Sequence, residues 1–154
     1  MQTKDIEKYI LKNFEDVYPL DTWGEKSFFI NPNKKLKRGT YFATIKEKDG
    51  DNDKSSNLDR DGVYRLNIGV SKELYLSMFN LIPKRPSKGQ MIEGDYNFQE
   101  LNAILPHPVY GWMSWVCILN PSKETFNNTV TDLLHNAYAK AHDITIKKIS
   151  KNCL

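Results

Sequence analysis

The sequence contains few of the residues that would assign it to a chemical class at once. It has only 2 cysteines in 154 residues, Cys117 inside an apolar segment and Cys153 beside the C-terminus, which is no disulfide framework. Basic and acidic residues nearly balance, 22 against 19, so the net charge of +3 does not by itself require a nucleic-acid partner. These properties fit a reducing compartment and leave the partner open.

Long apolar runs are also missing. No stretch of about 18 apolar residues occurs, so we expect no transmembrane helix, and segment 1–14 lacks the apolar centre of a signal peptide. The sequence therefore predicts a cytoplasmic protein. Its 154 residues are the length of one domain, and neither a repeat nor a linker divides them. We expect one domain over 1–154, with a frayed basic tail over 143–154.

Hydrophobic periodicity predicts helices at both ends of the chain. One helical face of the first segment, which Pro19 is expected to end, is apolar: Ile6, Ile10, Leu11, Phe14 and Val17. Ser71 is placed to cap a short helix, and Asn97 begins a capping-box pattern for a brief helix to Leu105. The last helix opens after Ser122 and carries an apolar stripe: Phe126, Val130, Leu133, Leu134, Ala137, Tyr138 and Ala141.

Strand patterns lie between these helices. They cover 25–30, 39–47 and 62–70, and the apolar run 105–121 is typical of a central strand buried on both faces. The polar segment 48–61 is expected to be an exposed loop. Together the patterns predict an α+β fold in which helices pack on one face of an antiparallel sheet.

Several segments resemble known families. Two strand-to-helix steps are similar to those of the MmcQ/YjbR-like superfamily, small α+β proteins with a CyaY-like fold: 64–68 followed by 71–73, and 110–119 followed by 133–138. Four further segments resemble a bacterial family known as a domain of unknown function: 23–25, 41–46, 49–53 and the HPVYGWMSW segment 107–115. This resemblance covers nearly the whole chain. It implies the α+β fold, a DNA-binding function suggested for superfamily relatives from their shape, and no catalytic residues.

A polar cluster at the sheet ends is the main candidate for a binding site: Trp23, Glu25, Lys46, Arg65, Asn67, His107, Tyr110 and Ser114. Strand alternation places Arg65 and Asn67 opposite the core residues, so their face can form the floor of a cleft. Pro106 and Pro108 fix His107 on a rigid turn. Because a guanidinium fork suits a carboxylate or phosphate, we expect a small anionic ligand, bound without catalysis and without a cofactor.

Two alternatives use the same residues. One is an enzyme that acts through His107 and Arg65, although no serine or cysteine lies in a nucleophile-elbow context and Cys117 is expected to be inert. The other is a purely structural role, in which Arg65 pairs with a carboxylate such as Glu25 or Glu47 and the imidazole hydrogen-bonds locally.

Basic residues provide the alternative function of nucleic-acid binding. They form three clusters: Lys34, Lys35, Lys37 and Arg38; Lys84, Arg85 and Lys88; and Lys147, Lys148 and Lys151. Such clusters follow a phosphate backbone only if the fold brings them together. The acidic residues of the polar loop predict no metal site: Asp49, Asp51 and Asp53 alternate as calcium ligands do, but the required glycine and glutamate are replaced by Lys54 and Arg60.

Overall fold

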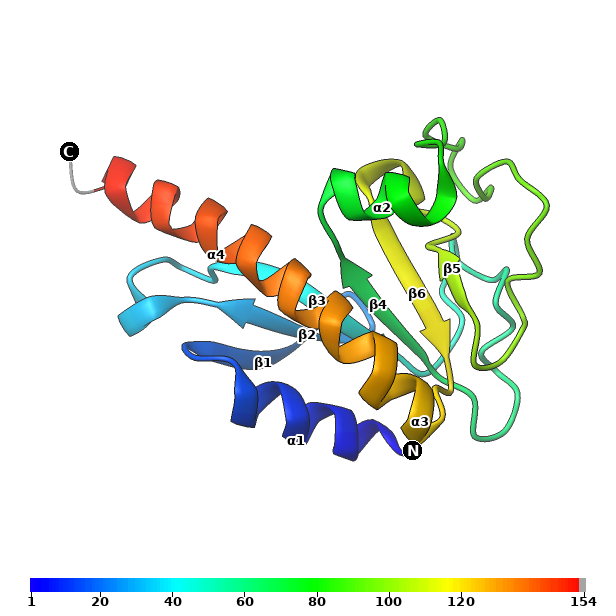
Figure 1. Ribbon diagram of the computed structural model, residues 1–154, viewed down its shortest axis with the longest axis horizontal. Coiled ribbons are helices and arrows are strands. Elements are labelled where there is room, and N and C mark those ends of the chain that lie inside the picture. Colours follow the sequence, from blue (N-terminus) through cyan, green and yellow to red (C-terminus); the bar gives the residue numbers. More distant parts are fainter. Residues whose placement is uncertain (153–154) are drawn as a thin grey trace.

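An antiparallel sheet organises the chain, with the strand order β1-β2-β3-β4-β6-β5 (Figure 1). The computed structural model describes residues 1–152. The strands are β1 (Val17–Thr22), β2 (Glu25–Ile30), β3 (Thr40–Lys46), β4 (Arg65–Gly69), β5 (Ile104–Pro106) and β6 (Trp115–Leu119). The helices are α1 (Thr3–Asn13), α2 (Lys72–Phe79), α3 (Lys123–Thr125) and α4 (Thr131–Asn152), with 3₁₀ turns η1 (Pro32–Lys34) and η2 (Gly111–Met113) and a π-helical turn η3 (Phe126–Val130). The predicted α+β fold is confirmed.

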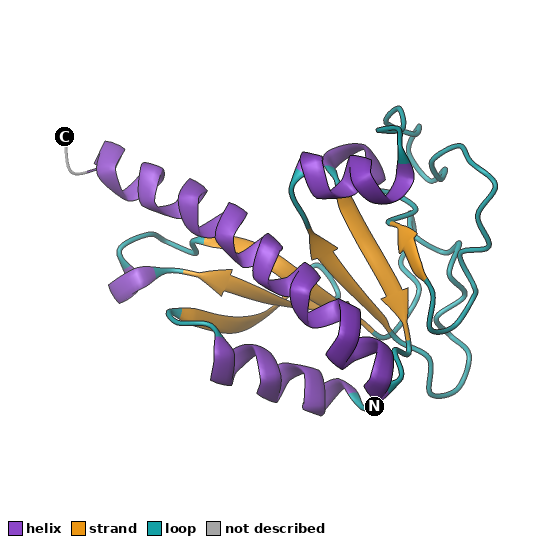
Figure 2. Cartoon of the chain, in the orientation of Figure 1, coloured by secondary structure: helices purple, strands orange, loops and turns teal. Residues whose placement is uncertain are grey.

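Helices cover one face of the sheet. The long α4 crosses it diagonally and α1 lies beside it (Figure 2). Strand register places Leu66 opposite Ile118 and Ile68 opposite Val116, so these side chains share the covered face. The main core joins this face to the helices: Ile6 and Ile10 from α1, Tyr75 from α2, and Leu134 and Ala137 from α4. Burial of these side chains supplies most of the driving force for folding.

Long connections cover part of the other face. A smaller core there consists of Ile92, Phe98, Leu105 and Cys117. The prediction that 48–61 is an exposed loop holds for most of its residues, which are exposed or partly exposed, but fails at Ser56 and Leu58, which are both fully buried. The loop folds down onto the sheet, where its polar side chains meet a buried guanidinium described below.

The first helix is shorter than predicted. It ends at Asn13, and after a turn Val17–Thr22 form β1, which pairs with β2 in antiparallel register. Pro19 lies within β1 and does not end a helix. Because β1 is an edge strand, a residue without a backbone N–H is tolerated there.

The apolar run 105–121 is not one strand. It contains β5, a turn that includes η2, and β6, and the chain reverses so that Pro106 lies opposite Val116. The brief helix expected from Asn97 to Leu105 is absent from the described structure, since the Asn97 side chain accepts from the Gln99 N–H within a turn and β5 begins at Ile104.

The C-terminal segment is more regular than expected. We predicted a frayed tail over 143–154, but α4 continues to Asn152, while Cys153 lies outside the described residues. Thr145 is fully buried on α4 and donates to the Ala141 carbonyl oxygen. Among residues 1–152, no helix is long and apolar enough to cross a membrane.

Leu66→Ala should lower the free energy of unfolding by about 2 to 5 kcal/mol, since Leu66 is fully buried between the sheet and the helices. The matched control is Leu20→Ala on β1, where the leucine is exposed and the change should be about 0.5 kcal/mol or less. Urea unfolding of both variants measures the difference. Equal losses would contradict the assignment of this face as the core.

Candidate functional site

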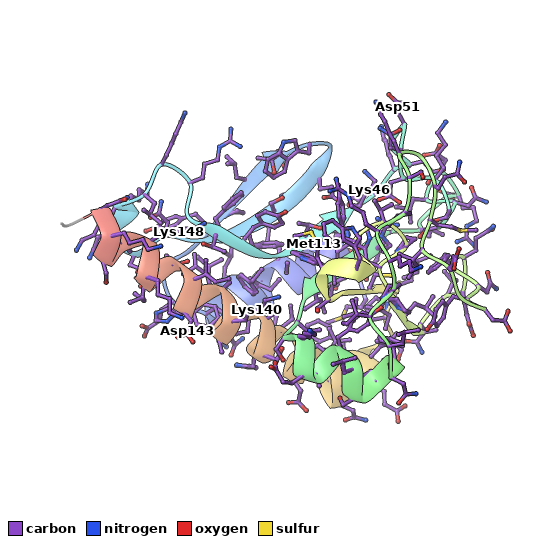
Figure 3. The ribbon with its side chains drawn as sticks, turned by 90° about the horizontal axis from the view of Figure 1, so that it is seen from above. Lys46, Asp51, Met113, Lys140, Asp143 and Lys148 are labelled. Atoms are coloured by element: carbon purple, nitrogen blue, oxygen red, sulfur yellow. The ribbon has the colours of Figure 1, made fainter. Side chains whose placement is uncertain are left out.

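A pocket of about 250 Å³ opens on the sheet face opposite α4. Its lining includes five residues of the predicted cluster: Trp23, Glu25, Asn67, His107 and Tyr110. The remaining lining residues were not predicted: Tyr41, Thr44, Met113 and Trp115. Figure 3 shows Met113, Lys46 and Asp51 on the side away from α4. Larger hollows of about 440 and 900 Å³ lie beside α1, but mainly polar and charged residues line them.

One wall of the pocket is a row of aromatic rings. The ring centroids of Trp23 and Tyr41 are 5.9 Å apart, and those of Tyr41 and Trp115 are 5.4 Å apart. Tyr41 comes from β3 and Trp115 from β6, with Gly69 of β4 between them. A Cβ at Gly69 would lie 2.7 Å from the Trp115 ring, so the glycine allows this ring to lie across β4 toward Tyr41.

A second part of the lining comes from the turn between β5 and β6. The His107 Nδ1 atom accepts the backbone N–H groups of Val109 and Tyr110, both at 3.0 Å. The Tyr110 ring lies beside the imidazole, with 5.1 Å between the ring centroids. Met113 also lines the pocket, and Ser114 ends η2 in a left-handed backbone conformation, with φ of 66°. The turn itself therefore fixes the position of the imidazole.

The floor of the pocket is held by Asn67. Its Nδ2 atom donates to Thr44 Oγ1 at 3.0 Å and to Glu25 Oε1 at 3.3 Å, and its Oδ1 atom accepts from Arg65 Nε at 2.8 Å. Register places Thr44 opposite Asn67 on adjacent strands. The amide thus links the Glu25 carboxylate at the surface to a guanidinium below the floor, and all three groups are oriented before any ligand enters.

Arg65 lies below the floor and does not line the pocket. It is 0% exposed. Besides the contact with Asn67, its Nη1 atom donates to Asp53 Oδ1 at 3.0 Å and to Ser56 Oγ at 2.8 Å, and its Nη2 atom pairs with Asp53 Oδ2. The expected partner, Glu25 or Glu47, was therefore wrong: the ion pair is made with Asp53. A guanidinium with these partners is not available to a ligand in the pocket.

The charges around Arg65 shift the titration of its neighbours. Burial raises the pKa of Asp53, but the hydrogen bonds and charge of Arg65 outweigh this effect and hold the pKa below its ordinary value. Burial and the Arg65 charge lower the pKa of His107 well below 6.5. Both ring nitrogens face N–H donors, since Nε2 lies 3.3 Å from Arg65 Nη2, so an imidazolium would have no acceptor. His107 is therefore neutral at pH 7.

Glu25 is the charged residue of the pocket lining. Burial raises the pKa of its carboxyl group, and the nearby charges of Lys46 and Arg65 oppose that shift. Across the described chain the ion pairs are Lys26 with Glu7 and Arg65 with Asp53, so Glu25 forms none.

Besides Arg65, two further predicted site residues lie outside the lining. Lys46 is buried, and its Nζ atom lies against Gly50, where an added Cβ would approach it to 3.3 Å. Ser114 is buried in the turn after η2.

The three basic clusters are divided between the two ends of the molecule. The connection between β2 and β3 and the C-terminal end of α4 lie at one end, whereas the segment after α2 lies at the other (Figure 1). Several of the cations stack on aromatic rings: Lys34 on Tyr18, Arg38 on Trp23 and Arg85 on Trp112.

The carboxylates of the polar loop have separate structural partners. Asp53 binds Arg65, and Asp49 accepts from the Leu58 N–H at 2.8 Å. Within residues 1–152 no group of three or more metal-ligating side chains converges.

Strand alternation does not predict that Tyr41 and Thr44 line the same pocket. The two are three residues apart, and alternation places such residues on opposite faces of a sheet. The sheet register shifts between Phe28 and Phe29, which places an extra residue, Phe42, in β3. This bulge brings Tyr41 and Thr44 to the same face. A bulge of this kind leaves no clear mark in the sequence.

Asp53→Asn should lower the free energy of unfolding by about 3 to 5 kcal/mol, because it leaves the buried Arg65 charge without its ion-pair partner. The control is Asp51→Asn on the same loop, where the carboxylate is exposed and the change should be about 0.5 kcal/mol or less. Urea unfolding at neutral pH measures both losses.

The same comparison has a predicted pH dependence. The folded-state pKa of Asp53 is lowered, so its contribution is complete above the ordinary aspartate pKa of about 3.9 and is lost as the pH falls below it. The difference between the native protein and Asp53→Asn should shrink in that range. A difference that stays constant on acidification would argue against the ion pair.

Comparison with known proteins gives a family and no function. A family described as a family of unknown function, DUF6194, matches residues 1–149. No curated protein and no solved structure matches the chain. The functional interpretation of the pocket therefore depends on its geometry alone. With nearly its whole length matched, the chain belongs to the DUF6194 family.

Proposed function

We propose that this protein is a binding module that holds a small molecule in the pocket between Trp115 and Tyr110 without catalysing a reaction on it. The observation that carries the proposal is the convergence of an aromatic wall, a fixed turn and a hydrogen-bonded floor on one pocket. Ligand sites have this composition, with apolar walls and a few oriented polar groups. The polar groups are already held by Arg65 and Asn67, so binding requires little ordering.

The chemistry of the lining supports binding over catalysis. Neither serine nor cysteine occurs among the residues that line this pocket. Cys117 lies beside the floor, but it is fully buried and its thiol pKa is raised to about 12. The lone pair of His107 Nδ1 already accepts from the backbone N–H groups of Val109 and Tyr110, so the neutral ring carries its proton on Nε2 and offers no free lone pair to a substrate. The alternative of an enzyme that uses His107 and Arg65 therefore has little support.

The expectation of an anionic ligand depended on an accessible guanidinium. Arg65 is fully buried, and its nitrogens contact Asn67, Asp53, Ser56 and His107. The charged side chain that reaches the pocket is instead the Glu25 carboxylate. A neutral or cationic ligand is better supported than an anion.

We also infer that the family is related to the MmcQ/YjbR-like superfamily. The support is the element order found here, in which β4 leads into α2 and β6 leads into the final helix, together with the resemblance of 64–73 and 110–138. A cytoplasmic location is supported by cysteine usage, since Cys117 is free and buried.

Nucleic-acid binding is a second candidate, favoured by the two basic clusters at one end of the molecule. Binding there should be salt-dependent, with a log-log slope of about −0.9 per phosphate neutralised. We expect weak binding at physiological salt. Submicromolar affinity for a duplex that is lost on replacing Lys34, Lys35 and Lys37 together by Ala, and kept on replacing Lys84, Arg85 and Lys88, would make this the better function.

The pocket can be tested with a thermal-shift screen of small amines, alcohols, carboxylates and nucleosides. A ligand at about 100 times its Kd stabilises the folded state by about 2.7 kcal/mol. Tyr110→Ala should remove the shift, because it deletes part of the pocket lining. Tyr18→Ala is the matched control, a partly exposed tyrosine on β1 outside the lining. If no compound gives a shift that Tyr110→Ala abolishes, the proposal is wrong.

A further inference from the structure

We propose that the pocket binds a small methylated ammonium group, held by its aromatic wall and by Glu25. This inference rests on the proposed binding function and specifies its ligand class. A trimethylammonium head group is the chemistry in question, whether a free metabolite or a modified lysine side chain carries it. The argument uses the charge of the lining, the arrangement of the rings and the number of hydrogen-bond acceptors.

The charge of the lining favours a cation. Glu25 is present, neither lysine nor arginine lines the pocket, and His107 is neutral. The Arg65 charge is already balanced by Asp53 below the floor. Lys46 is buried nearby and its charge lowers the pKa of Glu25, but its Nζ atom forms no ion pair in the described chain. A half-buried carboxylate without an ion-pair partner gains from a cation brought into the same low-dielectric space.

The aromatic wall provides a second attraction for a cation. The rings of Trp23, Tyr41 and Trp115 follow one another at centroid distances of 5.9 and 5.4 Å, and Tyr110 also lines the pocket. The negative face of an aromatic ring attracts a cation within about 6 Å of its centroid, and tryptophan does so best. The Trp23 ring already meets the Arg38 guanidinium, 5.7 Å from its centroid, so among the described residues Tyr41 and Trp115 are the rings of this wall without a cation of the protein.

The small number of unused acceptors favours a methylated nitrogen over a primary ammonium. A primary ammonium has three N–H donors to satisfy, whereas a quaternary ammonium has none. Thr44 Oγ1 and Glu25 Oε1 already accept from Asn67, and His107 Nδ1 accepts from the turn. The acceptors left in the lining are therefore chiefly the second Glu25 oxygen and the hydroxyls of Tyr41 and Tyr110. Methyl groups instead contact the rings. The volume of about 250 Å³ suits such a head group, and Trp23, which is 67% exposed, leaves the mouth open for a longer substituent.

Three probes of nearly the same shape separate charge from size. Choline carries the trimethylammonium group. In 3,3-dimethylbutan-1-ol a carbon atom replaces its nitrogen, and 3,3-dimethylbutanoate is the carboxylate anion of similar shape. Calorimetric titration of the 154-residue chain should show choline binding at least about 10-fold more tightly than the alcohol. The anion should bind most weakly, because it is repelled by Glu25 and by the faces of the rings.

Two substitutions identify the groups responsible. Glu25→Gln should weaken choline binding about 10-fold and leave the alcohol unchanged, since the amide keeps the shape and removes the charge. The matched control is Glu47→Gln, an exposed carboxylate outside this pocket, which should change neither. Trp23→Leu should weaken choline more than the alcohol, because leucine keeps apolar contact without a π face. The fold of each variant is checked by its unliganded melting temperature.

The same titrations identify the source of the trimethylammonium group and can also overturn the inference. A short peptide with trimethyl-lysine that binds more tightly than choline would assign the group to a protein side chain, and the reverse order to a metabolite. The inference is overturned if the alcohol or the anion binds as tightly as choline, or if choline and the peptide fail to bind at millimolar concentration. In either case a different compound whose thermal shift disappears in Tyr110→Ala would leave the binding function itself intact.

Discussion

The buried guanidinium of Arg65 is the group on which the site depends. An unpaired charge in this position would cost several kcal/mol, so its surroundings must supply acceptors for its donors. Asp53 and Ser56 come from the loop above the sheet and Asn67 from the same strand. The ion pair thereby anchors a polar loop that has little apolar surface of its own to bury. Of the acceptors that Arg65 requires, Asn67 also lines the pocket.

The two faces of the sheet are built by different physical means. The face under α1 and α4 is held by apolar contacts, which tolerate small shifts in direction and distance. On the other face, the row formed by Thr44 and Asn67 is held by hydrogen bonds with defined geometry. Binding a small ligand requires fixed directions, and the polar face supplies them. The helical face supplies the stability that allows a charged group to remain buried.

Local sequence patterns correctly predicted which face of the sheet Arg65 and Asn67 occupy. They did not predict which groups Arg65 contacts. Alternation in β4 was enough to separate Arg65 and Asn67 from Leu66 and Ile68, since it depends only on neighbouring residues. The pairing of Arg65 with Asp53 depends on how a long loop folds back, and no local rule specifies that contact. The reversal between Pro106 and Val116 was hidden because two short antiparallel strands and one long strand have the same apolar composition.

Asn67 separates two carboxylates that would otherwise compete for one cation. Its amide accepts from Arg65 and donates to Glu25, so Asp53 pairs with the guanidinium below while Glu25 faces the pocket. If Glu25 reached Arg65 directly, the site would contain no carboxylate free to meet a ligand. Replacement of this amide by an aliphatic side chain would remove the acceptor for Arg65 Nε and the donor to Glu25 together. The position therefore requires a side chain that is both donor and acceptor, which is a stricter demand than polarity alone.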